Sequence, residues 1–325
     1  MALDNRVKRF LVQTPVGGIL LMPLRFATAL GHYLPKLKYI LNWTFSSRET
    51  TNFTYEITAK NQEYLAHTIS VVTGVPYATV TGYLREIQED ENVKRHVIER
   101  VKKDPRQRTA DETCAFGRRV GWYAFVRILK PRVVVETGVD KGLGSVLLCA
   151  ALMRNQGEGF PGQYFGTDIN PEAGFLLAEP YNSVGRILYG DSIQSLQLIP
   201  GIDLFVNDSD HSAQYERQEY EIIAPKLRGG GLILGDNCHC NDVLANFSTG
   251  CGRQFVFFRE EPRDHWYPGG GIGISFVRES LPVQRPSAKA AVAEERFRPS
   301  IAAIDSDQSQ SAVLVGPSVG PSKAP

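Results

Sequence analysis

PRVVVETGVDKGLGS, residues 131–145, carries the clearest indication of the fold. Its three valines, Val133 to Val135, predict a strand that is buried on both faces in the middle of a parallel sheet. Glu136 and a set of glycines follow, and Ser145 begins an apolar run that predicts a buried helix. A strand, a glycine-rich turn and a helix let a nucleotide approach the backbone, because glycine adopts positive φ and has no Cβ. A tight turn that binds no ligand is the alternative.

The spacing of Gly138, Gly142 and Gly144 differs from the G-x-G-x-x-G of dinucleotide-binding proteins, which disfavours an NAD-dependent oxidoreductase. An acidic residue two positions before the first glycine resembles motif I of the class I S-adenosylmethionine-dependent methyltransferases. That resemblance implies that the turn holds the methionine end of S-adenosylmethionine. The implied cofactor-binding residues are Glu136, Gly138, Gly142 and Ser145.

Two further acids are candidates for binding the nucleoside. Asp168 ends the next short strand, where a carboxylate can accept hydrogen bonds from both ribose hydroxyls. A helix N-cap before Pro171 is the alternative role for Asp168. By the same resemblance, Asp191 borders the adenine after a third strand and could accept a hydrogen bond from its amino group. A role at the start of the next helix, together with Ser192, competes with that contact.

Acids and a histidine follow the fourth predicted strand, Ile202 to Asn207. The chain there reads Asp208-Ser209-Asp210-His211-Ser212, and a fifth strand later ends in Asp236-Asn237. Open α/β sheets bind ligands at the carboxyl ends of their strands, so we expect these residues to share one site. Oxygen ligands of this kind are those that Mg²⁺ prefers, and a bound ion would lower the pKa of a substrate hydroxyl.

This pattern, with Leu227-Arg-Gly-Gly-Gly231, resembles the D-G-D-H-S-Y, L-x-P-G-G and Asp-Asp signature of one methyltransferase group. The group contains the macrocin-type O-methyltransferases and the relatives of cephalosporin hydroxylase, and the resemblance covers residues 109–279. It implies that Asp210 is the catalytic base and that Asp208 lies at both the cofactor and a divalent metal. The implied metal ligands are Asp208, Asp236 and Asn237.

Two departures from that signature weaken the predicted metal site. Asn237 stands where the group has an acid, and Ser209 stands where it has a glycine. We therefore expect weaker metal binding, or residues that only cap helices and shape turns. His211 and His239 are alternative bases in an enzyme without metal. Cys238-His239-Cys240 does not have the spacing of a structural zinc site.

The predicted fold is α/β, a Rossmann-like and mostly parallel sheet of seven strands with an antiparallel C-terminal hairpin, preceded by helices. Residues 1–108 form the helical region, residues 109–279 the methyltransferase domain, and residues 280–325, rich in Pro, Ser and Ala, a disordered tail. Within the helical region, residues 55–72 and 80–101 carry apolar side chains at helical spacing.

Residues 1–48 combine basic residues, aromatic residues and a short apolar stretch with a single acid, Asp4. This composition suits a helix that lies in a membrane interface. A helix that packs on the domain or on a second subunit is the alternative. The sequence shows no signal peptide and no run of about 18 uncharged apolar residues, so no transmembrane helix is predicted.

A formal net charge of +1 gives no argument for a nucleic-acid partner. Five cysteines, an odd number in a long chain, indicate a reducing compartment, so we expect a cytoplasmic protein, membrane-associated if residues 1–48 bind lipid. We predict an enzyme, active as a monomer or a homo-oligomer, that transfers a methyl group from S-adenosylmethionine to a hydroxyl of a small-molecule acceptor with help from Mg²⁺. The alternatives are a metal-independent O- or N-methyltransferase and a non-catalytic membrane or scaffold protein that keeps the fold.

Overall fold

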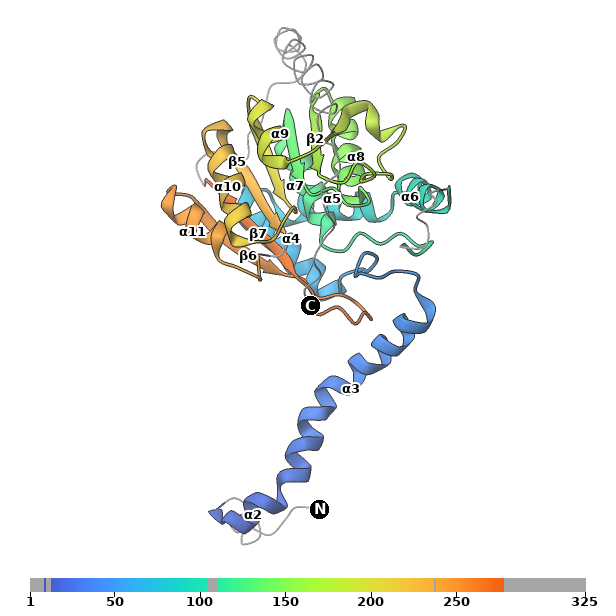
Figure 1. The fold of residues 1–325 in the computed structure, drawn as a ribbon, viewed down its shortest axis with the longest axis vertical. Coiled ribbons are helices and arrows are strands. Elements are labelled where there is room, and N and C mark those ends of the chain that lie inside the picture. Colours follow the sequence, from blue (N-terminus) through green and yellow to red (C-terminus); the bar gives the residue numbers. More distant parts are fainter. Residues whose placement is uncertain (1–8, 10–12, 104–109, 237, 278–325) are drawn as a thin grey trace, which may run out of the picture.

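A computed structural model describes residues 9, 13–103, 110–236 and 238–277, and Figure 1 shows a sheet between two layers of helices. The strand order is β3-β2-β1-β4-β5-β7-β6, and β7 runs antiparallel to both of its neighbours. This topology confirms the predicted Rossmann-like sheet with antiparallel C-terminal strands. The strands are β1 Val133–Thr137, β2 Gln163–Asp168, β3 Gly185–Tyr189, β4 Ile202–Asn207, β5 Leu227–Asp236, β6 Gln254–Arg259 and β7 Gly271–Phe276.

Strand β1 lies in the centre of the sheet, as its valines predict. Val134 packs into the hydrophobic cluster on one face, and Val133 and Val135 pack into the cluster on the other. All three are fully buried, because successive side chains of a strand alternate between faces and both faces are covered. Strand order reverses between β1 and β4, and an open α/β sheet leaves a ligand-binding crevice at such a point.

Helices cover the two faces of the sheet separately (Figure 1). The first face carries α4 Ala59–Thr73, α5 Tyr77–Gln88, α6 Glu91–Lys103, α7 Arg119–Leu129 and α8 Leu143–Gly157. The second face carries α9 Ser192–Leu198, α10 Ala213–Ile223 and α11 Val243–Gly250. The helical residues before β1 thus complete one layer of the domain core.

Two local predictions are wrong. The helix expected over residues 80–101 is two helices, because Asp90 begins α6 by accepting a hydrogen bond from the N–H of Val93 at 3.1 Å. A glycine run such as Arg228–Gly231 predicts a turn before the fifth strand, but these glycines lie inside β5. There the pairing of β5 with β4 shifts register between Ile202 and Leu204, which accommodates the extra residues.

Helices α2 Pro15–Leu20 and α3 Met22–Ser46 extend away from the rest of the protein (Figure 1). No residue of α3 is buried. Near its end, the Tyr39 hydroxyl donates to Asp264 Oδ1 at 2.7 Å, and the ring of Trp43 lies 5.1 Å from that of Trp266. No described helix is long and apolar enough to cross a membrane.

The predicted limits of the regions, 1–108 and 109–279, stay predictions, and the predicted tail 280–325 lies outside the described residues. Helices α4 to α6 lie before residue 109 and share a hydrophobic core with the sheet, so the packing continues across the first of these predicted limits. All five cysteines are free thiols.

Candidate active site

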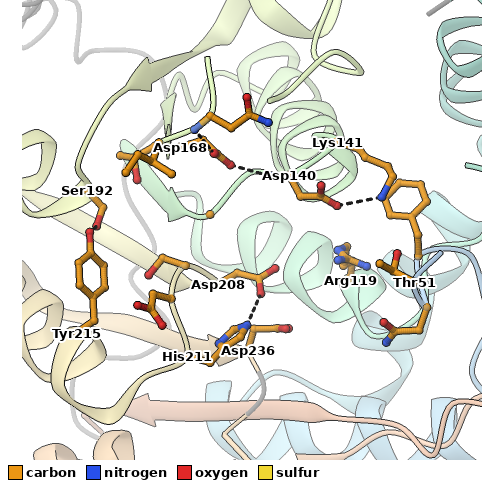
Figure 2. A pocket seen from close by; sticks show the side chains of 18 of the residues that line it. Thr51, Arg119, Asp140, Lys141, Asp168, Ser192, Asp208, His211, Tyr215 and Asp236 are labelled. Carbon is orange, nitrogen blue, oxygen red and sulfur yellow. Dashed lines mark hydrogen bonds and ion pairs between the residues drawn. The ribbon is translucent and has the colours of Figure 1, made fainter. Parts of the chain in front are cut away.

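A cavity of about 710 Å³ opens at the carboxyl ends of β1, β2, β4 and β5. Figure 2 shows Asp208, His211 and Asp236 on one side of it and Asp168, Asp140 and Lys141 on the other. The cavity therefore lies where the strand order reverses, at the position expected for ligands of an open α/β sheet.

The glycine-rich turn after β1 forms one wall of the cavity. Gly138 lines it with φ +79°, and a Cβ at this position would lie 1.9 Å from the carbonyl oxygen of Asp208. Gly142, with φ +95°, is the N-cap of α8 and is not one of the lining residues. The turn therefore requires glycine at residue 138 both for its backbone angle and for its approach to the next loop.

Glu136 and Ser145 lie beneath this turn rather than on the cavity wall. Both are buried, and the Ser145 hydroxyl donates to Glu136 Oε2 at 2.9 Å. The Tyr164 hydroxyl donates to the same oxygen. Burial raises the pKa of Glu136 to about 7, although these two hydrogen bonds act in the opposite direction. The pair braces the turn, and its direct contact with a cofactor stays a prediction.

Asp168 ends β2 and faces the turn. Its Oδ2 accepts from the backbone N–H groups of Val139 at 3.0 Å and Asp140 at 2.9 Å, and its Oδ1 accepts from Asn170 at 2.8 Å. The carboxylate is thus fixed at the cavity edge by the turn it supports. A carboxylate has about four acceptor positions, so one on Oδ1 is available to a ligand.

Asp191 is the N-cap of α9, and it accepts from the N–H of Ile193 at 2.8 Å. The Tyr215 hydroxyl donates to the same Asp191 oxygen at 2.8 Å and lies 2.8 Å from the Ser192 hydroxyl. Ser192 and Tyr215 line the cavity, and Asp191 does not. Ser192 also donates to the buried carboxylate of Glu219, so this wall presents a connected set of polar groups.

Asp208 and Asp236 meet at the ends of β4 and β5, next to a buried arginine. Arg118 Nε donates to Asp236 Oδ1 at 2.5 Å, and its Nη2 pairs with Asp236 Oδ2. Arg118 Nη1 donates to Glu260 Oε1 at 2.8 Å and to the Tyr55 hydroxyl at 2.6 Å. The guanidinium therefore pairs with Asp236 through two parallel hydrogen bonds, and it also donates to the buried Glu260 carboxylate and Tyr55 hydroxyl.

These contacts shift the pKa values of the two aspartates in opposite directions. Burial and then repulsion by Asp236 raise the pKa of Asp208 well above its usual value. Burial alone would raise the pKa of Asp236 as well, but Arg118 holds it below its usual value. Asp236 is therefore the ionised member of the pair, and Asp208 takes up a proton more readily.

His211 stands between Asp208 and a buried acid. Its Nε2 lies 3.8 Å from Asp208 Oδ1, and its Nδ1 lies 3.7 Å from Glu216 Oε1. The interaction with Glu216 raises the pKa of His211, against the opposite effect of burial. One atom each from Asp208, His211 and Asp236 lie within 4.8 Å of one another. Asp210 is exposed and accepts from the N–H of Ser212 at 2.9 Å.

Two further residues proposed from the sequence follow β5, Asn237 and His239. Asn237, a predicted metal ligand, lies outside the described residues. His239, an alternative base, is exposed, and its Nε2 lies 3.6 Å from Cys240 Sγ. His239 does not line the cavity, and His211 does.

Several lining residues were not predicted from the sequence. Arg118 and Arg119 come from the start of α7, Tyr215 comes from α10, and Thr51 to Phe53 come from the segment after α3. A pair of arginines at the start of an apolar helix was a usable signal, because a buried cation needs an acidic partner. Tyr215 and residues 51–53 carry no comparable signal, because only the folded chain brings them to the cavity.

Residues 135–238 match the family model described as a methyltransferase domain. This match runs from within β1 to just past the end of β5 and contains most of the residues that line the cavity. Over these residues the chain is similar to methyltransferase domains, and its sheet has the Rossmann-like topology of the methyltransferase fold. No curated protein matches this chain in sequence.

Solved methyltransferase structures resemble this chain. The O-methyltransferase TomG from Streptomyces achromogenes has 15% identity and a TM-score of 0.39, covering 58% of this chain and 90% of TomG. An O-methyltransferase from Bacillus cereus has 15% identity and a TM-score of 0.37, over 66% and 97% of the two chains. A methyltransferase from Geobacter sulfurreducens has 16% identity and a TM-score of 0.42, over 55% and 88%.

Proposed function

We propose that this methyltransferase methylates a hydroxyl of a small-molecule acceptor, with no nucleic-acid partner. The observation that carries the proposal is that Asp168, Asp208 and Asp236, from the ends of three strands, face one cavity beside the glycine turn. One cavity can then hold the cofactor and an acceptor side by side. The resemblance of the segments around residues 208 and 236 to the macrocin and cephalosporin hydroxylase group supports the same assignment.

In this proposal S-adenosylmethionine lies along the turn. Gly138 borders its methionine end, with Glu136, Gly142 and Ser145 behind the turn. Asp168 Oδ1 has acceptor capacity for one ribose hydroxyl, and a second hydroxyl would compete with the N–H groups on Oδ2. The adenine lies against Ser192 and Tyr215, next to Asp191.

The acceptor hydroxyl loses its proton to Asp210 or to His211, the two proposed catalytic residues. Its oxygen then forms a bond to the methyl carbon while the carbon–sulfur bond breaks, and the sulfur keeps the electron pair. Positioning of the two substrates in line supplies much of the rate. The His211 ring is more closely fixed in position than the Asp210 carboxylate, because Asp208 and Glu216 flank the ring.

Mg²⁺ fits the donor set in part. The oxygens of Asp208 and Asp236, with Asn237 as the third proposed ligand, are of the type that Mg²⁺ binds. A bound ion would lower the pKa of the acceptor hydroxyl. However, Arg118 already pairs with both oxygens of Asp236, so an ion there has to share a neutralised carboxylate.

The Arg118 contact favours a second candidate function, a metal-independent O- or N-methyltransferase with His211 as the base. In this candidate the guanidinium supplies the positive charge that the metal would otherwise bring to Asp236. A homo-oligomer and a cytoplasmic location stay predictions. The predicted membrane contact of residues 1–48 would be made by α2 and α3, which do not line the cavity.

Thermal unfolding tests the proposal in the wild type, Asp168→Ala and Asp208→Ala, with S-adenosylmethionine and with or without Mg²⁺. Ligand at about 100 times its dissociation constant adds roughly 2.7 kcal/mol and raises the melting temperature by several degrees. We expect the cofactor to stabilise the wild type and not Asp168→Ala. A further Mg²⁺ shift that Asp208→Ala abolishes supports the metal site, and its absence supports the metal-independent candidate.

Asp242→Asn is the matched control, because the Asp242 side chain makes no capping hydrogen bond and does not line the cavity. It should respond to the cofactor as the wild type does. If S-adenosylmethionine stabilises none of these proteins, the proposal is wrong and a non-catalytic role that retains the fold gains support.

A further inference from the structure

We propose that α3 binds the interface of an anionic lipid bilayer through one apolar face. Most of the large apolar side chains that are exposed in the described residues lie between Val16 and Phe45. Phe26 is 68% exposed, Tyr33 67% and Phe45 86%. Contiguous exposed apolar surface on this scale marks a binding surface.

The apolar face follows from the helical spacing. Phe26, Leu30, Tyr33, Leu37 and Ile40 recur at steps of three and four residues, so their side chains share one side of α3. All five are exposed. At about 100° per residue, Lys36 and Lys38 fall at the two borders of this face. An apolar face with lysines along its borders is the arrangement of helices that lie in a bilayer interface.

A different side of α3, about 100° to 140° around the helix from the centre of the apolar face, contacts the domain. Tyr39 and Trp43 are the half-buried residues of the helix, and they contact Asp264 and Trp266 in the connection between β6 and β7. The apolar face therefore points away from that contact. Figure 1 shows α3 leaving the domain as a separate arm, which leaves the face open to a surface larger than a small ligand.

Charge distinguishes a bilayer from a second copy of this chain. Residues 15–46 contain Arg25, Lys36 and Lys38 and no acidic residue. Pairing two copies through this face would bring lysines together with no carboxylate to oppose them. An anionic bilayer supplies the missing negative charge. Because no described helix can cross a membrane, α3 would lie in the plane of the interface.

Co-sedimentation of the full chain with vesicles tests the proposal, using phosphatidylcholine with phosphatidylserine and phosphatidylcholine alone. We expect binding to the anionic vesicles, and a loss of at least about tenfold in Leu30→Ser/Leu37→Ser, which removes apolar area from the face. Lys36→Gln/Lys38→Gln should weaken binding by about fivefold per lysine, and added salt should do the same to the wild type.

The matched control is Leu24→Ser/Val71→Ser, which makes the same kind of change at residues 62% and 77% exposed but off this face. It should bind as the wild type does, and circular dichroism should show that all variants are folded. Failure of the wild type to bind anionic vesicles overturns the proposal, as does equal binding by the face variant. Light scattering that shows a dimer lost only in the face variant, without vesicle binding, would assign the face to a second copy.

Discussion

At the scale of single residues, the site depends on buried polar groups whose partners come from elsewhere in the chain. Glu136 is fully buried and accepts from Ser145 and Tyr164. Its raised pKa of about 7 lies well above the ordinary 4.5. The folded state thus binds a proton at Glu136 more tightly than the unfolded chain does, and that contribution to stability is lost as the pH rises from 4.5 to about 7.

Glu136→Gln removes this titration. The difference between the two pKa values corresponds to about 3 kcal/mol, so the variant should gain up to about that much stability relative to the wild type between pH 4 and pH 8. Urea unfolding of both proteins at the two pH values measures the change. A constant difference between the proteins at both values would show that Glu136 does not titrate in this range.

Gly138→Ala should be strongly destabilising, because its Cβ would meet the Asp208 carbonyl oxygen at 1.9 Å and φ is +79°. We expect a loss of more than about 2 kcal/mol in chemical unfolding, together with loss of cofactor binding. Gly82→Ala is the control, since Gly82 lies inside α5 with no atom within 4 Å of an added Cβ. It should gain about 1 kcal/mol. Equal stability of the two variants would contradict the close approach of the turn to Asp208.

At the scale of elements, Arg118 joins the start of α7 to the ends of β5 and β6. It pairs with Asp236 and Glu260, and these side chains are all buried. The three elements come from separate parts of the sequence. Their pairing therefore fixes the position of the helical layer relative to the carboxyl ends of the strands, where the site lies.

Arg118→Met would leave the charges of Asp236 and Glu260 buried without a cation. We expect a loss of about 3 to 5 kcal/mol in the free energy of unfolding, measured in urea. Arg119→Met is the neighbouring control, because Arg119 is only partly buried and forms a cation–π contact with Trp122 at 5.4 Å. The free energy of unfolding of Arg119→Met should fall by only about 1 kcal/mol. Similar losses in the two variants would show that the buried pair is not the stabilising feature.

At the scale of the whole molecule, α2 and α3 contribute little to the core. Removal of residues 1–46 takes away the Tyr39–Asp264 and Trp43–Trp266 contacts and leaves the core clusters intact. We expect cooperative unfolding of the shortened chain with a melting temperature within a few degrees of the wild type. Calorimetry of the two proteins measures this, and a broad, non-cooperative transition would show that the arm is part of the fold.

Local sequence patterns were sufficient to predict the fold and the positions of the acids at the strand ends. The Val133–Val135 run, its glycine turn and the acids after the strands are local patterns, and alternation and turn chemistry act over a few residues. These patterns predict Asp168, Asp208 and Asp236 at one edge of a sheet, and the structure brings all three to one cavity. The family match over residues 135–238 covers the same segment.

Tertiary structure alone decided which groups pair within that site and which surface is left open. Arg118 meets Asp236 and Tyr55 meets Glu260 across long stretches of chain, so no local pattern encodes these contacts. They set the charges of Asp208 and Asp236, because the pKa of a buried carboxyl follows its burial and its nearest charges. The basic and apolar composition of residues 1–48 was likewise visible in the sequence, but the exposure of the apolar face of α3 depends on how few side chains the rest of the protein packs against it.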